Sequence, residues 1–194
     1  MQLIPQNFTG RFVQLEPLAE SHREGLRVAG ADPAIWAYLS INGYGPAFDP
    51  WFDKARQMHE TGVHIAFAVR RLTDNALVGS TRFLEIVPEH KRAEIGWTWY
   101  ATSAQASSVN PECKLLLLNH AFAAGANRVE LKTDARNARS RAAIAKLGAK
   151  QEGIFRAHMV VRDGHISDSV YFSIIRSEWP GVRAGLEARL AAAN

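Results

Sequence analysis

The fold is indicated most clearly by residues 93–122, AEIGWTWYATSAQASSVNPECKLLLLNHAF. The first eight residues of this stretch, Ala93–Tyr100, are rich in aromatic side chains and predict a strand. A short turn of small and polar residues follows. From Pro111 to about Ala124 the sequence predicts a helix in which Leu115–Leu118 stand in a row. Apolar residues therefore cover nearly its whole circumference, so we expect this helix to be buried on more than one side, against a sheet.

The turn before this helix has the composition of an anion site. A helix N-terminus presents unpaired N–H groups and a partial positive charge. Small side chains let a ligand approach the backbone there, and Ala106, Ser107 and Ser108 are small. Asn110-Pro111 predicts an N-cap followed by the first helical residue. A phosphate site and an ordinary strand-to-helix turn both fit this pattern.

A second stretch, RVELKTDARNARSRAAIAKLGAKQEG at residues 128–153, predicts another strand followed by a helix. Asn137 is the predicted N-cap of the helix, and Gly148 is predicted to end it. Ser140 shares the i, i+4, i+7 spacing with Ile144 and Leu147, so its side chain is expected to face inward with theirs.

Arginines surround the start of this second helix, at positions 136, 139 and 141. Basic side chains at a helix N-terminus oppose the macrodipole, and this arrangement favours an anion nearby. Solvated surface arginines are the alternative interpretation.

The other predicted elements lie around these two stretches. They are a strand at 10–18, helices at 19–29, 32–39 and 49–62, a hairpin of strands at 63–72 and 76–86, strands at 151–161 and 165–175 joined by a two-residue turn at Asp163-Gly164, and a helix in the tail from 178. Strands alternating with helices indicate an α/β or α+β fold with a mixed sheet. Without repeats or linker-like segments, we expect one domain over residues 1–194.

Composition limits the class of protein. A chain of 194 residues can bury roughly 70% of its unfolded surface. Cys113 is the single cysteine, which excludes an internal disulfide and a Cys-rich zinc site, and we expect it to be a packing residue. The start of the chain does not resemble a signal peptide, and no apolar run reaches membrane-spanning length, so a cytoplasmic protein with no membrane association is expected. The net charge of +4 is too small to indicate nucleic-acid binding but is compatible with an anionic small ligand.

Several common site motifs are absent. The sequence has no GxGxxG, no GxxxxGK[ST] and no GxSxG. His59-Glu60 and His64 are similar to a zincin motif, but five residues turn two helical side chains about 140° apart. Gly62 would also end the helix between them. We therefore expect no metal site.

Together the two stretches resemble the GNAT superfamily of N-acetyltransferases, and most closely its ribosomal-protein N-terminal acetyltransferase (RimL-type) branch. The resemblance covers about residues 10–179, which leaves 180–194 as a helical tail. It implies a mixed, strongly twisted central sheet flanked by helices. It also implies that two central strands, around 94–100 and 128–134, splay apart and hold acetyl-CoA between them as co-substrate.

The resemblance implies a set of residues that bind acetyl-CoA. Residues 105–110 match the family's pyrophosphate loop. Gln105 keeps the first position, but Ser108 and Asn110 stand where glycine, and glycine or alanine, are usual; these side chains could crowd the phosphates or, through Ser108, donate to them. Asn137 matches an asparagine near the pantetheine arm. The full predicted set is Trp97, Thr98, Trp99, Gln105, Ala106, Ser107, Ser108, Val109, Asn110, Asn137, Ser140 and Arg141.

The resemblance also suggests a mechanism of direct attack in a ternary complex. Acetylation needs a neutral amine, so a base must remove a proton. Glu94, where family members commonly place a carboxylate, is the predicted base. The alternative is a strand carboxylate that faces solvent or pairs with Lys91 or Arg92. Ile144 occupies the position of a common family tyrosine, so Ser140 is the predicted hydrogen-bond donor to the thioester sulfur. The alternative is that Ser140 is a packed small polar residue and that the thiolate, with a pKa near 8.5, leaves without a dedicated acid. Backbone N–H groups of Trp97–Trp99 would stabilise the oxyanion.

The acceptor is left open as a peptide N-terminus or a small primary amine. Asp168 and Glu85 are predicted to attract its amine, and four aromatic residues are expected near the groove or in the core: Trp36, Tyr38, Tyr44 and Trp51. A homodimer is a further expectation from the resemblance. The alternative function is a catalytically idle CoA-binding or regulatory module of the same fold.

Overall fold

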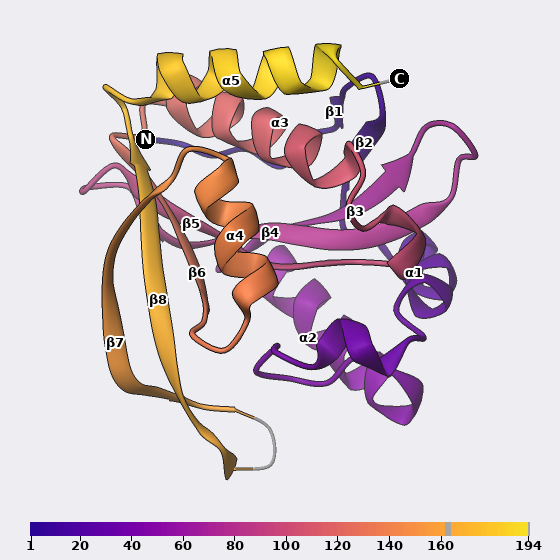
Figure 1. The fold of residues 1–194 in the computed structure, drawn as a ribbon. Coiled ribbons are helices and arrows are strands. Elements are labelled where there is room, and N and C mark those ends of the chain that lie inside the picture. The colour runs from indigo at the N-terminus through magenta and orange to yellow at the C-terminus, as the bar shows by residue number, and fades with distance from the viewer. Residues whose placement is uncertain (162–163, 194) are drawn as a thin grey trace.

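One mixed sheet forms the centre of the protein, with helices on both of its faces (Figure 1). The computed structural model describes residues 1–161 and 164–193, and within them the strand order is β1-β2-β3-β4-β5-β6-β8-β7. The strands are β1 (Phe8–Thr9), β2 (Val13–Pro17), β3 (Ile65–Arg71), β4 (Leu77–Val87), β5 (Arg92–Tyr100), β6 (Arg128–Asp134), β7 (Lys150–Val160) and β8 (Ile166–Ile175). The α-helices are α1 (Arg23–Ala29), α2 (Phe48–Glu60), α3 (Val109–Ala123), α4 (Ala138–Lys146) and α5 (Trp179–Ala191).

The two central strands separate along their length. β5 and β6 are parallel and pair only at Arg92–Glu94 with Arg128–Glu130, whereas the neighbouring strand pairs are antiparallel. No further β5–β6 pair follows among the residues that the structure describes. This arrangement confirms the predicted mixed sheet with two splayed central strands.

Each face of the sheet has its own core. α3 and α5 cover one face, with Leu117 and Leu118 fully buried in a cluster that includes Phe83 of β4. α1 and α2 cover the opposite face, where Phe48 and Phe52 are buried (Figure 1). The expectation that α3 would be buried on more than one side is confirmed, and Cys113 is buried within it as a packing residue.

The start of α3 differs from the prediction. The helix begins at Val109, and its N-cap residue is Ser108, whose side chain makes no capping bond. Asn110 lies inside the first turn, and its Oδ1 accepts a hydrogen bond from the Tyr100 hydroxyl at 3.2 Å. A tertiary partner therefore replaces the local capping role that its position before a proline predicted.

Other boundaries follow local rules more closely. Asn137 caps α4 as predicted, because its Oδ1 accepts a bond from the Ser140 N–H at 2.9 Å. Gly148 follows the helix with a φ of +95°, a conformation that favours glycine. The predicted helix at 32–39 is shorter, a 3-10 turn at Pro33–Trp36. Of the predicted two-residue turn between β7 and β8, Asp163 lies outside the described residues.

No helix within residues 1–161 and 164–193 combines the length and apolar composition that a membrane crossing requires.

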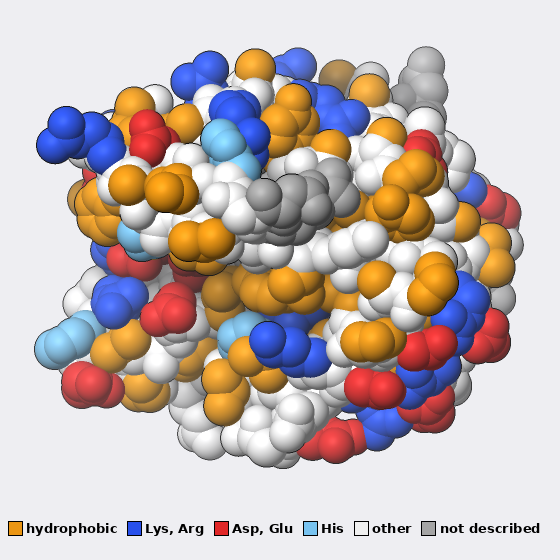
Figure 2. All heavy atoms as spheres, turned by 90° about the horizontal axis from the view of Figure 1, so that it is seen from below, with side chains coloured by type: hydrophobic (Ala, Val, Ile, Leu, Met, Phe, Trp, Pro, Cys, Tyr) orange, Lys and Arg blue, Asp and Glu red, His pale blue; other side chains and the backbone are white. Residues whose placement is uncertain are grey.

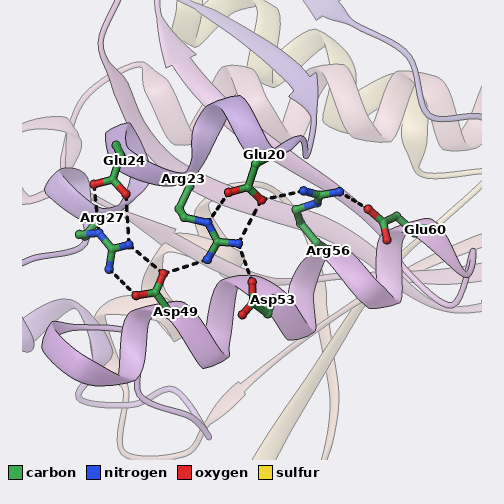
Figure 3. Close-up of polar contacts among 8 residues, drawn as sticks. All are labelled: Glu20, Arg23, Glu24, Arg27, Asp49, Asp53, Arg56 and Glu60. Carbon is green, nitrogen blue, oxygen red and sulfur yellow. Dashed lines mark hydrogen bonds and ion pairs between the residues drawn. The ribbon is translucent and has the colours of Figure 1, made fainter.

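A network of ion pairs joins α1 to α2 (Figure 3). Arg23 and Arg27 of α1 both donate to Asp49 of α2, at 2.8 Å and 2.7 Å. Their guanidinium groups also lie over the rings of Phe52 and Phe48, at 4.4 Å and 4.6 Å from the ring centroids. The network therefore fixes α2, whose Trp51 lines part of the site described below.

We expect Asp49→Asn to lower stability slightly at neutral pH, by an amount that salt reduces. Hydrogen bonds from Arg27 and Arg23 lower the pKa of Asp49 to about 2. A lowered folded-state pKa stabilises the fold above the ordinary carboxyl range, about pH 4, and this stabilisation is lost as the pH falls toward about 2. Urea midpoints of the two proteins should therefore converge on acidification. Glu187→Gln, which breaks only a local pair within α5, is the control; a gap that persists at low pH would contradict this role of Asp49.

Candidate active site

A cleft opens where β5 and β6 stop pairing. Its walls come from these two strands, from the segment after β5, from α3 and α4, and from the 3-10 turn at Pro33–Trp36. Apolar side chains line its interior: Ile95, Leu131, Ala143, Ile144 and Leu147. Thr98, Asn110, Lys114, Asn137 and Ser140 supply polar groups. The cleft thus offers a ligand both apolar surface and hydrogen-bonding groups.

A bulge shapes the wall of the cleft on β5. Ser80 pairs with Trp99 and Arg82 with Gly96, so Trp97 and Thr98 stand opposite a single residue of β4. Trp97 has a φ of +49°, a strained conformation for a large side chain. Bulges leave backbone groups outside the ladder and are common beside active sites. The bulge therefore exposes strand backbone at the point where the strands diverge.

The N-terminus of α3 forms the mouth of the cleft. Among the described residues, no hydrogen bond occupies the backbone N–H groups of Ala106, Ser107 and Ser108. Ala106 has a φ of +55°, which is unusual for a residue other than glycine. The arrangement of free N–H groups before a helix is suited to a phosphate group.

Gln105 and Arg139 hold this mouth together. The Gln105 amide donates to the Tyr100 carbonyl at 3.0 Å, and its oxygen accepts from Arg139 of α4 at 2.5 Å. Arg139 lines the cleft, whereas Arg136 pairs with Asp134 at 2.7 Å. Arg139 is therefore the member of the predicted arginine cluster that is placed to meet an anionic ligand.

The predicted cofactor residues divide into two groups. Eight of them line the cleft: Trp97, Thr98, Trp99, Gln105, Ala106, Asn110, Asn137 and Ser140. Four do not: Ser107, Ser108, Val109 and Arg141. The Ser107 hydroxyl donates to the Ala104 carbonyl at 2.6 Å. Val109, the first residue of α3, is buried in the core between this helix and the sheet. The Asn110 side chain is turned toward Tyr100 by the hydrogen bond described above.

Glu94 lies at the last residue pair between β5 and β6, and only 3% of its surface is exposed. Burial raises the pKa of its carboxyl, an effect that the nearby Lys132 ammonium partly opposes. Lys132 Nζ of β6 is 3.7 Å from Glu94 Oε2. Neither Lys91 nor Arg92 is its partner, and Arg92 pairs with Glu130 instead. A buried carboxyl with a raised pKa is suited to accept a proton near neutral pH.

A second hollow reaches Glu94 from the α2 side of the sheet. It is lined by Tyr38, Leu39, Ser40, Ile41, Trp51, Glu94, Trp97, Trp99, Lys132, Thr133, Asp134, Met159, Val161, Ser167 and Ser169. In Figure 2 this face is hollowed near its centre, and the side chains there are mostly hydrophobic. The two hollows share residues of both splayed strands and two residues that precede α2: Trp97 and Trp99 of β5, Lys132, Thr133 and Asp134 of β6, and Tyr38 and Leu39. They therefore meet in the gap between the splayed strands.

The structure does not place the predicted acceptor carboxylates in this hollow. Asp168 accepts a bond from the Ala157 N–H at 2.7 Å, and its strand neighbours Ser167 and Ser169 face the hollow instead. Strand alternation explains the difference, since successive side chains point to opposite faces. Glu85 is exposed outside both hollows, with a φ of +47°. Of the predicted aromatic residues, Tyr38 and Trp51 line the hollow, while Trp36 is fully buried and Tyr44 packs against the core.

Two residues of the site were missed by the sequence analysis, Lys114 and Lys132. Lys114 lies in a helix that is otherwise apolar on nearly every side. A lysine in such a helix is expected to be buried, and this signal could have identified it as a candidate. Lys132 is a partly buried residue of β6, and its neighbours on either side, Leu131 and Thr133, are buried. Both side chains line the cleft.

The two histidines of the zincin-like segment do not meet at a metal site. Gly62 lies between them with a φ of +73°, beyond the end of α2. His59 Nδ1 accepts from the Ala66 N–H at 3.3 Å, while burial lowers the pKa of His64 to about 4. Over the part of the chain that the structure describes, no group of three or more metal-ligating side chains gathers.

A comparison with protein families supports what the geometry indicates. A model of the acetyltransferase (GNAT) domain matches residues 13–150. The chain belongs to the GNAT acetyltransferase family. The match spans both splayed strands, the α3 mouth and α4, and therefore the whole cleft.

Individual relatives agree with this family. The "Putative ribosomal N-acetyltransferase YdaF" of Bacillus subtilis is 30% identical over 111 residues, which are 57% of this chain and 60% of that protein. A GCN5-related N-acetyltransferase from Brucella melitensis has a TM-score of 0.91 at 30% identity, over 97% of this chain and 87% of its own. RimJ of Mycobacterium smegmatis, in complex with CoA-disulfide, shares the fold, with a TM-score of 0.77 at 21% identity over 91% and 88% of the two chains.

The residues present fit acetyl-CoA, the acyl donor that the family implies. Its phosphates would lie at the free N–H groups before α3, beside Arg139. Its pantetheine arm would follow the apolar interior, past Leu131 and Ile144, to the gap beside the β5 bulge.

Proposed function

We propose that the protein is an acetyl-CoA-dependent N-acetyltransferase that acts on a primary amine by direct attack in a ternary complex. The meeting of the two hollows at the gap between β5 and β6 carries this proposal. One hollow offers an acyl-CoA apolar walls and hydrogen-bonding groups. The other leads to Glu94, a buried carboxylate that can accept a proton.

In this mechanism Glu94 removes a proton from the acceptor ammonium or from the attacking amine, directly or through a water. Lys132, at 3.7 Å, keeps the carboxyl ionised to a greater extent than burial alone would allow. The backbone of Trp97–Trp99 stabilises the oxyanion, because Trp97 and Thr98 lie in the bulge and have no register partner in β4. Ser140, which faces the cleft, donates a hydrogen bond to the thioester sulfur.

The residues that line the second hollow indicate the chemical class of the acceptor. Tyr38, Trp51, Trp97 and Met159 make it largely apolar, and Asp134 is held by Arg136 and Ser167. A primary amine on a neutral or apolar group, either a peptide N-terminus or a small molecule, fits such a wall. A homodimer stays a prediction, which light scattering tests.

The first experiment separates an enzyme from an idle CoA-binding module. We expect calorimetry to show binding of acetyl-CoA, and a thiol-reactive chromogenic assay with DTNB to show CoA release with some members of a panel of amines and N-terminal peptides. Binding without release across the whole panel would support the idle module. Absence of binding to CoA would contradict both functions.

A further inference from the structure

A buried lysine lies on the opposite side of the gap from Glu94. Lys114 of α3 has only 4% of its surface exposed, and its side chain lines the acyl-CoA cleft. Its Nζ donates to Thr98 Oγ1 at 2.9 Å, and Thr98 Oγ1 lies 2.8 Å from Thr81 Oγ1. Among the described residues no carboxylate pairs with this ammonium. An unpaired buried cation is costly, so an anionic or electron-rich partner is expected in its vicinity.

The location of Thr98 places Lys114 at the reacting end of the cleft. Thr98 lies in the β5 bulge between Trp97 and Trp99, two residues of β5 that line both hollows. α3 covers the face of the sheet opposite α2, and Glu94 is reached from the α2 side. The acyl-transfer point therefore lies with Glu94 on one side and Lys114 on the other.

The other charged and titratable groups of this cleft have partners or lie elsewhere. Lys132 is near Glu94, Asp134 is paired with Arg136, Arg139 is bound to Gln105 at the mouth, and the Tyr100 hydroxyl is bound to Asn110. Tyr38 is 45% exposed. On α3 itself, Cys113 is buried in the core and the Glu112 carboxylate is bound by backbone N–H groups of residues 11–13.

We propose that Lys114 is a catalytic residue that stabilises and protonates the departing CoA thiolate, an inference that rests on the proposed function. The amine nitrogen forms a bond to the acetyl carbon, and the carbon–sulfur bond breaks with its electron pair on sulfur. The proton from the amine passes to Glu94, and a proton from the Lys114 ammonium passes to sulfur. Solvent then returns a proton to Lys114 and takes one from Glu94, so an amide and a free thiol are formed without other reactants.

The acidity of the ammonium suits this role. Burial lowers the pKa of Lys114 to about 8. The pKa of an ordinary thiol is about 8.5, so proton transfer from the Lys114 ammonium to the thiolate changes the free energy very little. At neutral pH the lysine is still mostly protonated. Ser140, the other predicted donor to the sulfur, carries no charge. Replacing Ser140 would therefore remove one hydrogen bond to the sulfur but would leave the positive charge of Lys114 in place.

The experiment measures the ionisation of the bound thiol and needs no acceptor. The complexes of CoA with the wild type, Lys114→Met and Lys114→Arg are titrated by the ultraviolet absorbance of the thiolate, with desulfo-CoA subtracted as the blank. We expect the pKa of the bound thiol to rise by about 1–3 in Lys114→Met, since a cation nearby lowers it by that amount. Lys114→Arg keeps the charge and should keep the low pKa.

Two controls make the result decisive. Lys146→Met removes an exposed lysine at the end of α4 and should leave the titration unchanged. Calorimetry with CoA shows first that each variant binds. Failure of the wild type to bind CoA would overturn the proposed function itself. Normal binding with identical thiol titrations in the wild type and Lys114→Met would overturn only the role of Lys114. A loss of CoA affinity in Lys114→Met without a shifted titration would assign Lys114 to the phosphates and equally overturn it.

Discussion

Replacing Glu94 with glutamine is expected to lower kcat by about 10²–10⁴-fold and leave the Kd for acetyl-CoA almost unchanged. The amide has nearly the same shape as the carboxylate but cannot accept the amine proton. Glu94 lines the acceptor hollow and not the acyl-CoA cleft, so donor binding should not depend on it. Steady-state kinetics with an accepted amine, combined with calorimetry, measure the two effects separately.

The pH dependence gives the same residue a second test. Burial raises the pKa of Glu94, so the wild-type kcat/KM should fall on the acid side of that raised value, where the base becomes protonated. Glu94→Gln should lack this acid limb. Glu187→Gln is the control, because Glu187 lies on α5 outside both hollows and does not contribute to the pKa of Glu94, so this variant should behave as the wild type.

Stability separates a catalytic role for Glu94 from a structural one. A carboxyl whose folded-state pKa is raised contributes its stability at low pH and loses it as the pH rises through that value. The neutral glutamine should therefore make the protein at least as stable as the wild type at neutral pH in urea unfolding. A variant that is slow and also clearly less stable would instead indicate a structural role, and an unchanged rate at every pH would exclude Glu94 from the mechanism.

The sequence alone predicted the elements whose structure depends on interactions between neighbouring residues. The alternation of β6, the Asn137 cap of α4 and the strand–turn–helix around the α3 mouth each depend on neighbours in the chain. The resemblance to the GNAT family then predicted how these elements are arranged, including the two central strands that splay apart. Eight of the twelve predicted cofactor residues line the cleft for this reason.

Tertiary contacts and the alternation of side chains along a strand explain the predictions that failed. Asn110 was predicted as a cap from its position before a proline, but the Tyr100 hydroxyl binds it. Asp168 was chosen by its charge near the start of β8, while the pleat turns Ser167 and Ser169 to the hollow. Glu112 and Lys114, two charges in a buried helix, find their partners on distant strands, which the sequence of the helix does not identify.

Glu112 is the residue of α3 on which we expect stability to depend most strongly. Its carboxylate is buried, with 5% of its surface exposed, and accepts three backbone hydrogen bonds from the turn that leads into β2. The donors are the N–H groups of Arg11, Phe12 and Val13, at 2.8, 2.7 and 2.8 Å. A Cβ at Gly10 would lie 2.3 Å from Glu112 Cδ, so the chain passes as close to the carboxylate as a glycine permits.

We expect Glu112→Ala to lower the free energy of unfolding by about 3–5 kcal/mol, because it leaves one buried and two part-buried amides without an acceptor. At about 2–4 °C per kcal/mol, the Tm should fall by roughly 10 °C. Glu112→Gln keeps a single acceptor oxygen in nearly the same place and should lose about half as much. Glu187→Ala, an exposed glutamate of α5, is the control and should change stability by less than about 0.5 kcal/mol. Urea unfolding of the four proteins measures these differences, and an alanine variant as stable as the control would show that water replaces the carboxylate at no cost.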